Sequence, residues 1–409
     1  MTATLPARSP GHLLRERGFR GLYLSAAVSG FGSQLTLVGL PLLAVSALGA
    51  GAGEVGLLSA LATITALVVG LPAGAWIDRT GRRGVMIAAD LGRVAVLGSV
   101  PLAWWADGLS MGHLYAVAVL TGVGRLFFDV AAQSVLPDVV GRDRLTAANS
   151  MLVGTSAAMD VSGSGLAGVV VQAAGAPVAI VIDTLTYLWS AWWLRAVPSQ
   201  APSRAQARTR MNRQIADGVR FVLGNRVLVV IAVQGAMVNL GIPLVTALLP
   251  VLIVGELDLP AWMLGAYLSA SGLGMLAGSA SAHLLSRWVG QGRATWLVGV
   301  WTAPAALALP FIAPGPGLWV SAAAYFVVTF RIGVNNVTLT SFRQQVTPDA
   351  MLGRVNATMR VVLIGAVGLG GLLAALVGEL YGVRAALWCG AVALALSWVP
   401  IAFSSTLRR

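Results

Sequence analysis

The chain has 409 residues, of which 57% are hydrophobic and only 10% are charged, and its mean hydropathy is +0.81. Soluble domains are about half apolar and about a quarter charged, so this composition excludes a water-soluble globular protein. The net charge is +12, yet the basic residues stand in short interruptions between apolar runs, which excludes a basic patch for nucleic acid. The single cysteine, Cys389, lies in an apolar run and leaves no thiol pair for a disulfide or a metal site.

Apolar runs of transmembrane length recur along the whole chain. A helix needs roughly 20 apolar residues to cross a bilayer, and the runs are continuous, as expected for helices. The first run is too long for the apolar core of a signal peptide, so we expect it to be retained. In chain order the sequence predicts twelve spans: Gly21–Leu48, Val55–Ile77, Val85–Trp105, His113–Leu136, Ala147–Ala174, Pro177–Leu194, Val227–Val254, Trp262–Leu285, Ala294–Ala313, Leu318–Phe342, Val355–Leu380 and Arg384–Phe403.

The arginines orient these spans. All 27 basic residues are arginines. If the N-terminus is cytoplasmic, all but four of them fall on the cytoplasmic side; the exceptions are Arg93, Arg125 and Arg331 inside spans, and Arg384 beside an outer loop. By the positive-inside rule, this bias predicts that both termini are cytoplasmic. The expected location is the bacterial cytoplasmic (inner) membrane, with many passes through the lipid bilayer.

The longest hydrophilic stretch, residues 195–226, divides the chain in the middle. Its second part carries apolar residues at 215, 219, 222 and 223, a spacing that predicts an amphipathic helix on the inner membrane surface. The predicted domains are an N-terminal cytoplasmic tail (1–20), a six-helix bundle (21–194), this linker (195–226), a second six-helix bundle (227–403) and a C-terminal cytoplasmic tail (404–409).

The two predicted bundles are related in sequence. A Pro-Asp pair followed by Gly-Arg comes after the fourth span, at 137–142, and again after the tenth, at 348–354. The preceding spans each hold a mid-span arginine, Arg125 and Arg331. Two six-helix repeats are an architecture of transporters, with the substrate site at the repeat interface.

A motif between the second and third spans carries a family resemblance. It reads Gly74-Ala-Trp-Ile-Asp78-Arg79-Thr-Gly81-Arg82-Arg83 and closely resembles the Gly-x-x-x-Asp-Arg-x-Gly-Arg-Arg/Lys signature of the major facilitator superfamily. With the six-plus-six topology, the resemblance covers almost the whole chain. Residues 89–93 and 136–149 resemble the drug-exporting branch related to macrolide and enterobactin exporters. The resemblance implies an all-α integral membrane fold with twelve transmembrane helices in two pseudo-symmetric six-helix bundles, acting as a monomer.

The same resemblance makes this motif a conformational latch on the cytoplasmic face, formed by Gly74, Asp78, Arg79, Gly81, Arg82 and Arg83. Asp78 can accept hydrogen bonds at a helix N-terminus, where the helix dipole favours an anion, and the resemblance implies that the eleventh span supplies that terminus. The arginines can pair with acids such as Asp129. The alternative is that they only enforce topology. The corresponding segment of the second half, 278–293, has no acid at the matching position, so we expect an asymmetric latch.

Ionisable groups at membrane depth are costly and therefore mark functional sites. Asp160 lies near the centre of the fifth span with no basic residue within one turn, so we predict that it couples transport to protons, together with Asp129. The alternative is an Asp160 that is permanently protonated or paired across helices. Asp90 and Arg93, three residues apart, are expected to neutralise each other as a structural pair. The family fold places the third and sixth spans at the periphery of the bundle, so Asp183 of the sixth span is also expected to lie away from the substrate path.

Polar residues on spans that the family fold places at the centre define the predicted substrate cavity. They are Gln34, Arg125, Gln234, Asn239, Arg331, Asn335 and Asn336. The two arginines could attract an anionic substrate or hold the acids of neighbouring spans.

The sequence therefore predicts a secondary active transporter that exports a small amphiphilic compound, such as a drug, an antibiotic or a siderophore-like molecule. Export would be driven by proton antiport with alternating access. The alternative is uptake or facilitated diffusion of a small solute, for example an anionic one. No enzyme, cofactor or metal site is expected, because the histidines are dispersed and no acyl-transfer motif occurs. An ATP-driven pump is disfavoured by the lack of a Gly-x-x-x-x-Gly-Lys-Ser/Thr loop, since the chain has no lysine.

Overall fold

The computed structural model describes residues 10–199 and 211–404, in which helices and short turns are the only elements. Within these ranges, the side chains of residues 10–12, 66–68, 70–76, 78–79, 142, 146, 211–215, 291 and 349–350 are outside the description.

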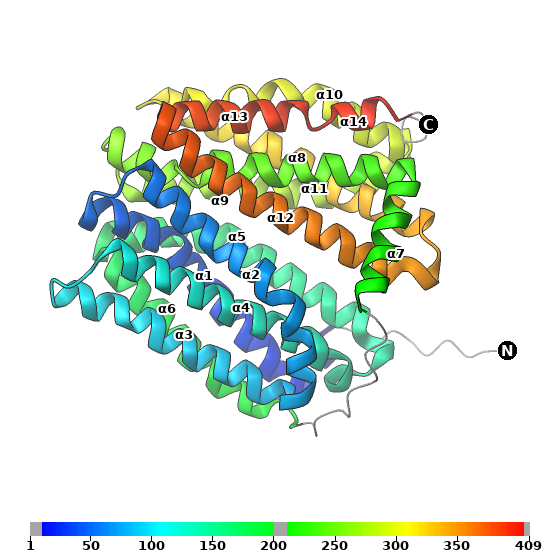
Figure 1. The fold of residues 1–409 in the computed structure, drawn as a ribbon, viewed down its shortest axis with the longest axis horizontal. Coiled ribbons are helices and arrows are strands. Elements are labelled where there is room, and N and C mark those ends of the chain that lie inside the picture. Colours follow the sequence, from blue (N-terminus) through cyan, green and yellow to red (C-terminus); the bar gives the residue numbers. More distant parts are fainter. Residues whose placement is uncertain (1–9, 200–210, 405–409) are drawn as a thin grey trace.

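Six long helices form the N-terminal half and a further set forms the C-terminal half, and the two halves lie side by side (Figure 1). The first half contains α1 (Arg17–Leu48), α2 (Ala52–Thr80), α3 (Arg82–Trp105), α4 (Met111–Val140), α5 (Leu145–Ala174) and α6 (Ala176–Trp193). The second contains α8 (Arg226–Thr246), α9 (Ala261–Val289), α10 (Gln291–Ala306), α11 (Pro316–Val346), α12 (Asp349–Tyr381), α13 (Val383–Leu396) and the short α14 (Val399–Ala402). Short helical turns are η1 (Pro10–Arg15), η2 (Arg142–Arg144), η3 (Leu194–Ala196), η4 (Val251–Glu256) and η5 (Leu309–Phe311).

Each predicted span coincides with a helix, which confirms the all-helical membrane fold. Nine helices in the described ranges are long and apolar enough to cross a membrane. The total of twelve spans stays a prediction. A helix, α7 (Met211–Gly224), also occurs where the linker pattern predicts one, and it lies across the end of the C-terminal half (Figure 1).

Three spans that the sequence predicts as continuous are interrupted near a proline. The seventh ends as α8 at Thr246 and resumes as the π-helical η4 after Pro250. The ninth ends as α10 at Ala306, four residues before Pro310, and resumes as η5. The twelfth ends as α13 at Leu396, four residues before Pro400, and resumes as α14. Proline lacks the amide hydrogen that would continue the helical ladder, so these breaks have a local cause.

Tight turns at glycine occur at matching positions in the two halves. Gly81, between α2 and α3, has a φ of 87°, and Gly290, between α9 and α10, has a φ of 86°. Gly175, between α5 and α6, and Gly382, between α12 and α13, both have a φ of 87°. Residues with a side chain rarely adopt this backbone conformation. The matching turns support the internal repeat that the sequence indicates.

Among the described side chains, the apolar core is shared between the halves at one end only. We call the helix ends that carry the arginine clusters inner ends, and the opposite ends outer ends. One cluster of buried residues joins the two halves and includes residues near the outer ends, such as Leu42 and Ile180 of the first half and Leu248 and Leu264 of the second. At the inner ends the buried clusters are separate, one in the N-terminal half and two in the C-terminal half. The halves are therefore held together mainly at their outer ends.

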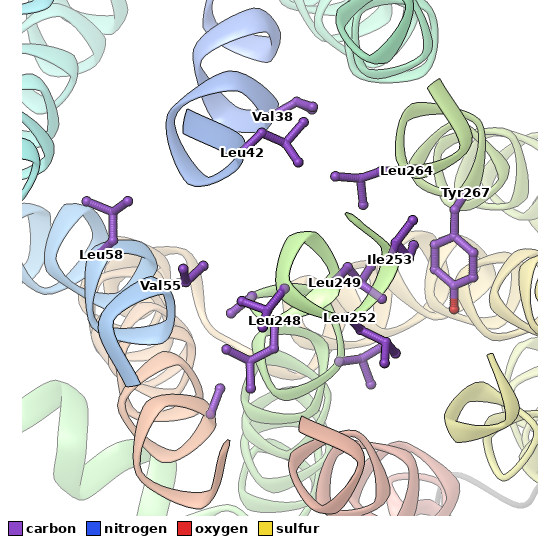
Figure 2. Packing of buried hydrophobic residues seen from close by; sticks show 14 of the residues in the cluster. Val38, Leu42, Val55, Leu58, Leu248, Leu249, Leu252, Ile253, Leu264 and Tyr267 are labelled. Carbon is purple, nitrogen blue, oxygen red and sulfur yellow. The ribbon is translucent and has the colours of Figure 1, made fainter. Parts of the chain in front are cut away.

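Figure 2 shows the centre of the shared cluster. The interruption of the helix after α8 places apolar side chains among those of α1, α2 and α9. We call the labelled residues the outer seal: Val38, Leu42, Val55, Leu58, Leu248, Leu249, Leu252, Ile253, Leu264 and Tyr267. All ten are at most 2% exposed.

Candidate functional site

A cavity of about 480 Å³ lies between the two halves. The first half contributes residues of α1 and α5, and the second half contributes residues of α8, α9, α11 and α12. Most of its surface is apolar, and amides, hydroxyls and two charged groups, Asp160 and Arg343, supply the polar part. Pockets for small molecules commonly have this make-up, in which apolar walls provide contact area and a few polar groups orient the ligand.

The cavity brings together five of the seven predicted substrate residues: Gln34, Gln234, Asn239, Asn335 and Asn336. Asp160, predicted for proton coupling, lines it too. Gln34 of α1 donates a hydrogen bond from Nε2 to Oδ1 of Asp160 on α5, at 2.6 Å. Asp160 makes no ion pair with any described residue.

Arg331 is not among the residues that line this cavity. Its side chain is buried, and its Nη2 donates to the main-chain oxygen of Leu394 on α13 at 2.7 Å. The neighbouring Ile332 does line the cavity. Successive helix positions point in directions about 100° apart, so a residue at the right depth can still face a neighbouring helix.

Arg125 and Asp129 also lie outside the lining. They form an ion pair along α4, with Arg125 Nε 3.9 Å from Asp129 Oδ2, as their four-residue spacing predicts. Their side chains are 73% and 48% exposed. An exposed pair of this kind contributes little to stability.

The structure adds a cavity residue that sequence reasoning assigned only to topology. Arg343 of α11 lines the cavity, and its Nε is buried without a hydrogen bond to any described residue. It ends a stripe along α11 at helical spacing: Thr329, Ile332, Asn335, Asn336, Leu339, Thr340 and Arg343. The spacing of the polar members was visible in the sequence and could have located this face.

Part of the predicted latch can be placed. The side chains of Asp78 and Arg79, and the surroundings of Gly74, lie outside the described part of the structure. Gly81 forms the turn described above. Arg82 donates from Nη1 to Asp138 Oδ2 at 2.7 Å and to the Ser134 oxygen at 2.9 Å, which ties the inner end of α3 to α4 within the N-terminal half. Arg83 is half-buried near the same turn.

Between described residues, hydrogen bonds join the two halves towards their outer ends. Ala261 N donates to Gln172 Oε1 at 2.8 Å, and Ser269 Oγ donates to the Val161 oxygen at 3.0 Å; both link α9 to α5. Gly53 N, in the first turn of α2, donates to Glu379 Oε2 at the end of α12, at 3.1 Å. These contacts close the outer side of the cavity.

The inner ends have more open surroundings. A Cβ added at Gly154 of α5 or at Gly353 of α12 would meet nothing within 4 Å. By contrast, a Cβ at Gly168, further out on α5, would lie 2.9 Å from the Gly265 Cα of α9. Together with the separate inner clusters, this difference indicates a cavity that opens towards the inner side.

The Glu379 contact gives a testable prediction. The N-terminus of a helix favours an anion by about 0.3–1 kcal/mol. Glu379→Gln is therefore expected to lower the ratio of closed to open outer sides by up to about fivefold. Reaction of a Ser271→Cys thiol in the cavity with an impermeant reagent added outside, in a Cys389→Ser background, measures this change. Glu256→Gln is the control. Equal reaction rates with and without Glu379→Gln would show that this contact does not hold the outer side closed.

The sequence matches the Major Facilitator Superfamily over residues 22–368. The chain is 27% identical, over 95% of its own length and 95% of the relative's, to the multidrug efflux pump Tap of Mycolicibacterium fortuitum. It is 25% identical over 48% of its length to 49% of the multidrug efflux pump Tap of Mycobacterium tuberculosis H37Rv.

Solved structures share the fold at low identity. A bacterial homologue of the iron transporter ferroportin in an inward-facing state has a TM-score of 0.75 at 17% identity, covering 94% of this chain and 98% of that one. The nucleoside transporter NupG, as its D323A mutant, has a TM-score of 0.74 at 13% identity, covering 94% of this chain and 100% of that one. With the paired helical halves and the central cavity, the sequence match establishes that this chain is a transporter of the Major Facilitator Superfamily.

Proposed function

We propose that this transporter exports small amphiphilic compounds in exchange for protons, by alternating access. The observation that carries the proposal is the position of Asp160. It is a carboxyl group in a mostly apolar cavity, hydrogen-bonded to Gln34 and without an ion pair among the described residues. A carboxyl group of this kind suits reversible protonation, since it faces a space that a substrate or water can enter.

The make-up of the cavity supports an amphiphilic substrate. Its walls include Leu37, Ile231, Val238 and Leu363, which offer contact area to an apolar body, and its amides offer both donors and acceptors. The similarity to the multidrug efflux pump Tap, which extends over nearly the whole chain, supports export as the direction. We therefore assign the five amides to substrate orientation and Asp160 to proton exchange.

The remaining residues complete the proposed cycle. Asp129, half-exposed on the inner part of α4, is proposed as a carboxyl group that passes protons between Asp160 and the cytoplasm, beside Arg125. Gly74, Asp78, Arg79, Gly81, Arg82 and Arg83 are proposed as the inner latch that forms when the cavity faces outward. The protein is proposed to work as a monomer in the bacterial cytoplasmic membrane, with no cofactor.

The alternative is uptake or facilitated diffusion of an anionic solute, and Arg343 is the observation that favours it. This guanidinium lines the cavity with a free Nε among the described atoms. However, Arg125 and Arg331, which suggested an anionic substrate, lie outside the lining. Efflux is therefore the better-supported function.

A susceptibility and export screen in a host without its own efflux pumps tests the proposal. Expression of the wild type is expected to raise tolerance to one or more amphiphilic compounds and to lower their accumulation, and Asp78→Asn is expected to remove this effect. Membrane abundance of both proteins, measured by immunoblot, is the control. Unchanged tolerance to every compound, combined with rescue of growth on a solute, would overturn efflux in favour of uptake.

A further inference from the structure

A buried charged cluster lies inside the N-terminal half, away from the central cavity. Asp90 and Asp183 are 0% exposed and Arg93 is 4% exposed. They come from α3 and α6, which pack against each other, and none of them lines the cavity. We propose that this cluster binds one proton, on Asp183, so that the N-terminal half holds a second proton site besides Asp160.

Asp90 has a cation and a hydroxyl as partners. Its Oδ1 accepts a hydrogen bond from Arg93 Nη2, and its Oδ2 accepts one from the Ser190 hydroxyl at 2.5 Å. Ser190 in turn lies within 2.6 Å of the Ser25 hydroxyl of α1. The Arg93 guanidinium also stacks over Tyr187, 4.2 Å from the ring centroid. The single cation of the cluster is thus paired with Asp90.

Asp183 has only neutral hydrogen-bonding partners. Thr36 of α1 donates to its Oδ2, and Thr186 lies 3.1 Å from its Oδ1. Thr186 shares its hydroxyl with the main-chain oxygen of Asp183, at 2.7 Å, so it satisfies the carboxyl group only in part. Two carboxylates and one guanidinium would leave an excess negative charge in a buried position. A buried group in this position takes up a proton in preference to remaining charged and unpaired.

Among the described residues, the neighbouring helices supply no second cation to Asp183. Asp90 and Arg93 of α3 are the charged groups that act on Asp183, among the residues that the structure describes. The part of α1 against it carries Ser33, which bonds to the Tyr187 hydroxyl at 2.8 Å, and Thr36. The ionisable groups deep in α4 and α5 are Arg125, Asp129 and Asp160, and none of them is hydrogen-bonded to this cluster.

One turn of α1 contacts both proton sites. Gln34 donates to Asp160 in the cavity, and Thr36, two residues later, donates to Asp183 inside the bundle. A side chain on Gly32 would collide with the Asp183 carboxyl and with Thr186, so the close approach of α1 to α6 requires glycine at this position. A shift of α1 would therefore alter the surroundings of both carboxyl groups together. The site is separate from the proposed proton exchange at Asp160, and its proton occupancy does not depend on that function.

Infrared spectroscopy of the purified full-length protein at neutral pH tests the proposal, because a protonated carboxyl group has its own C=O stretching band. Asp183→Asn is expected to remove the intensity of one protonated carboxyl. Arg93→Gln is expected to add the intensity of one, since Asp90 then loses its cation. Asp107→Asn, on an exposed outer turn, is the control and should leave the band unchanged.

Thr36→Val provides a second test, which can be used if Asp183→Asn fails to fold. It leaves every ionisable residue of the cluster in place. Loss of the hydroxyl is expected to shift the frequency of the Asp183 band while its intensity stays the same. If the band is the same in wild type, Asp183→Asn and Thr36→Val, Asp183 carries no proton and the proposal is overturned. Loss of the band only in Asp160→Asn would overturn it as well, while leaving proton exchange at Asp160 in place.

Discussion

Replacing Asp160 by asparagine is expected to abolish export driven by a pH gradient while leaving binding of the exported compound in place. Asparagine has nearly the same size as aspartate, and it can still accept the hydrogen bond from Gln34, which lies 2.6 Å from Asp160. It cannot take up or release a proton at any physiological pH. The cavity should therefore keep its shape and lose its response to protons.

Proteoliposomes with an imposed pH gradient measure the first effect, and titration with the compound identified by the susceptibility screen measures the second. We expect gradient-driven transport at the level of empty liposomes and a dissociation constant within about threefold of wild type, a change of less than about 0.7 kcal/mol. Asp107→Asn, the same chemical change outside the cavity, should transport normally. Undiminished gradient-driven transport by Asp160→Asn would remove this residue from the coupling role.

The second large effect is expected from Gly168→Val. Gly168 lies against α9, where an added Cβ would be 2.9 Å from both the Ala261 oxygen and the Gly265 Cα. Main-chain atoms cannot rotate away as a side-chain end can, so the two helices must separate. Overpacking costs about 1–3 kcal/mol, and a penalty of about 2 kcal/mol changes the ratio of closed to open outer sides about 30-fold.

Gly154→Val is the matched control because it makes the same change on the same helix. A Cβ at Gly154 meets nothing within 4 Å, so both variants make the same change in helix propensity and only Gly168→Val disturbs a contact. The Ser271→Cys thiol, labelled from outside, should react faster in Gly168→Val and at the wild-type rate in Gly154→Val. Equal rates in all three proteins would mean that α5 and α9 do not close the outer side.

Depth in the membrane could be predicted from the sequence, because apolar runs and arginine positions report it directly. Every predicted span coincides with a helix, and five predicted amides, such as Gln34 and Asn335, line one cavity. Direction around the helix was harder to predict. Arg331 and Arg343 lie on the same helix, and only the one near its inner end reaches the cavity. Hydropathy reports depth and not direction around a helix, and on α11 only the spacing of its polar residues carries that direction.

Pairings across helices were beyond prediction for a related reason. The spacing of Asp90 and Arg93 predicted their ion pair correctly, since both lie on α3. Nothing in the sequence places Asp183 beside them, because α6 begins more than eighty residues after Arg93. The charge balance of the cluster, and with it the proposed proton on Asp183, follows only from the packing of α1, α3 and α6.

The outer seal has a consequence for the passage of protons through the protein. A proton crosses a membrane protein along water or along a chain of polar groups, and nine of the ten seal residues are aliphatic side chains that provide neither. The tenth, Tyr267, uses its hydroxyl at 3.0 Å from Ser321 within the C-terminal half. In this conformation the seal acts as an electrical insulator between Asp160 and the exterior. Under the proposed proton antiport, a transporter in this conformation is expected to leak no protons, so the proton gradient would be used only when a substrate is moved.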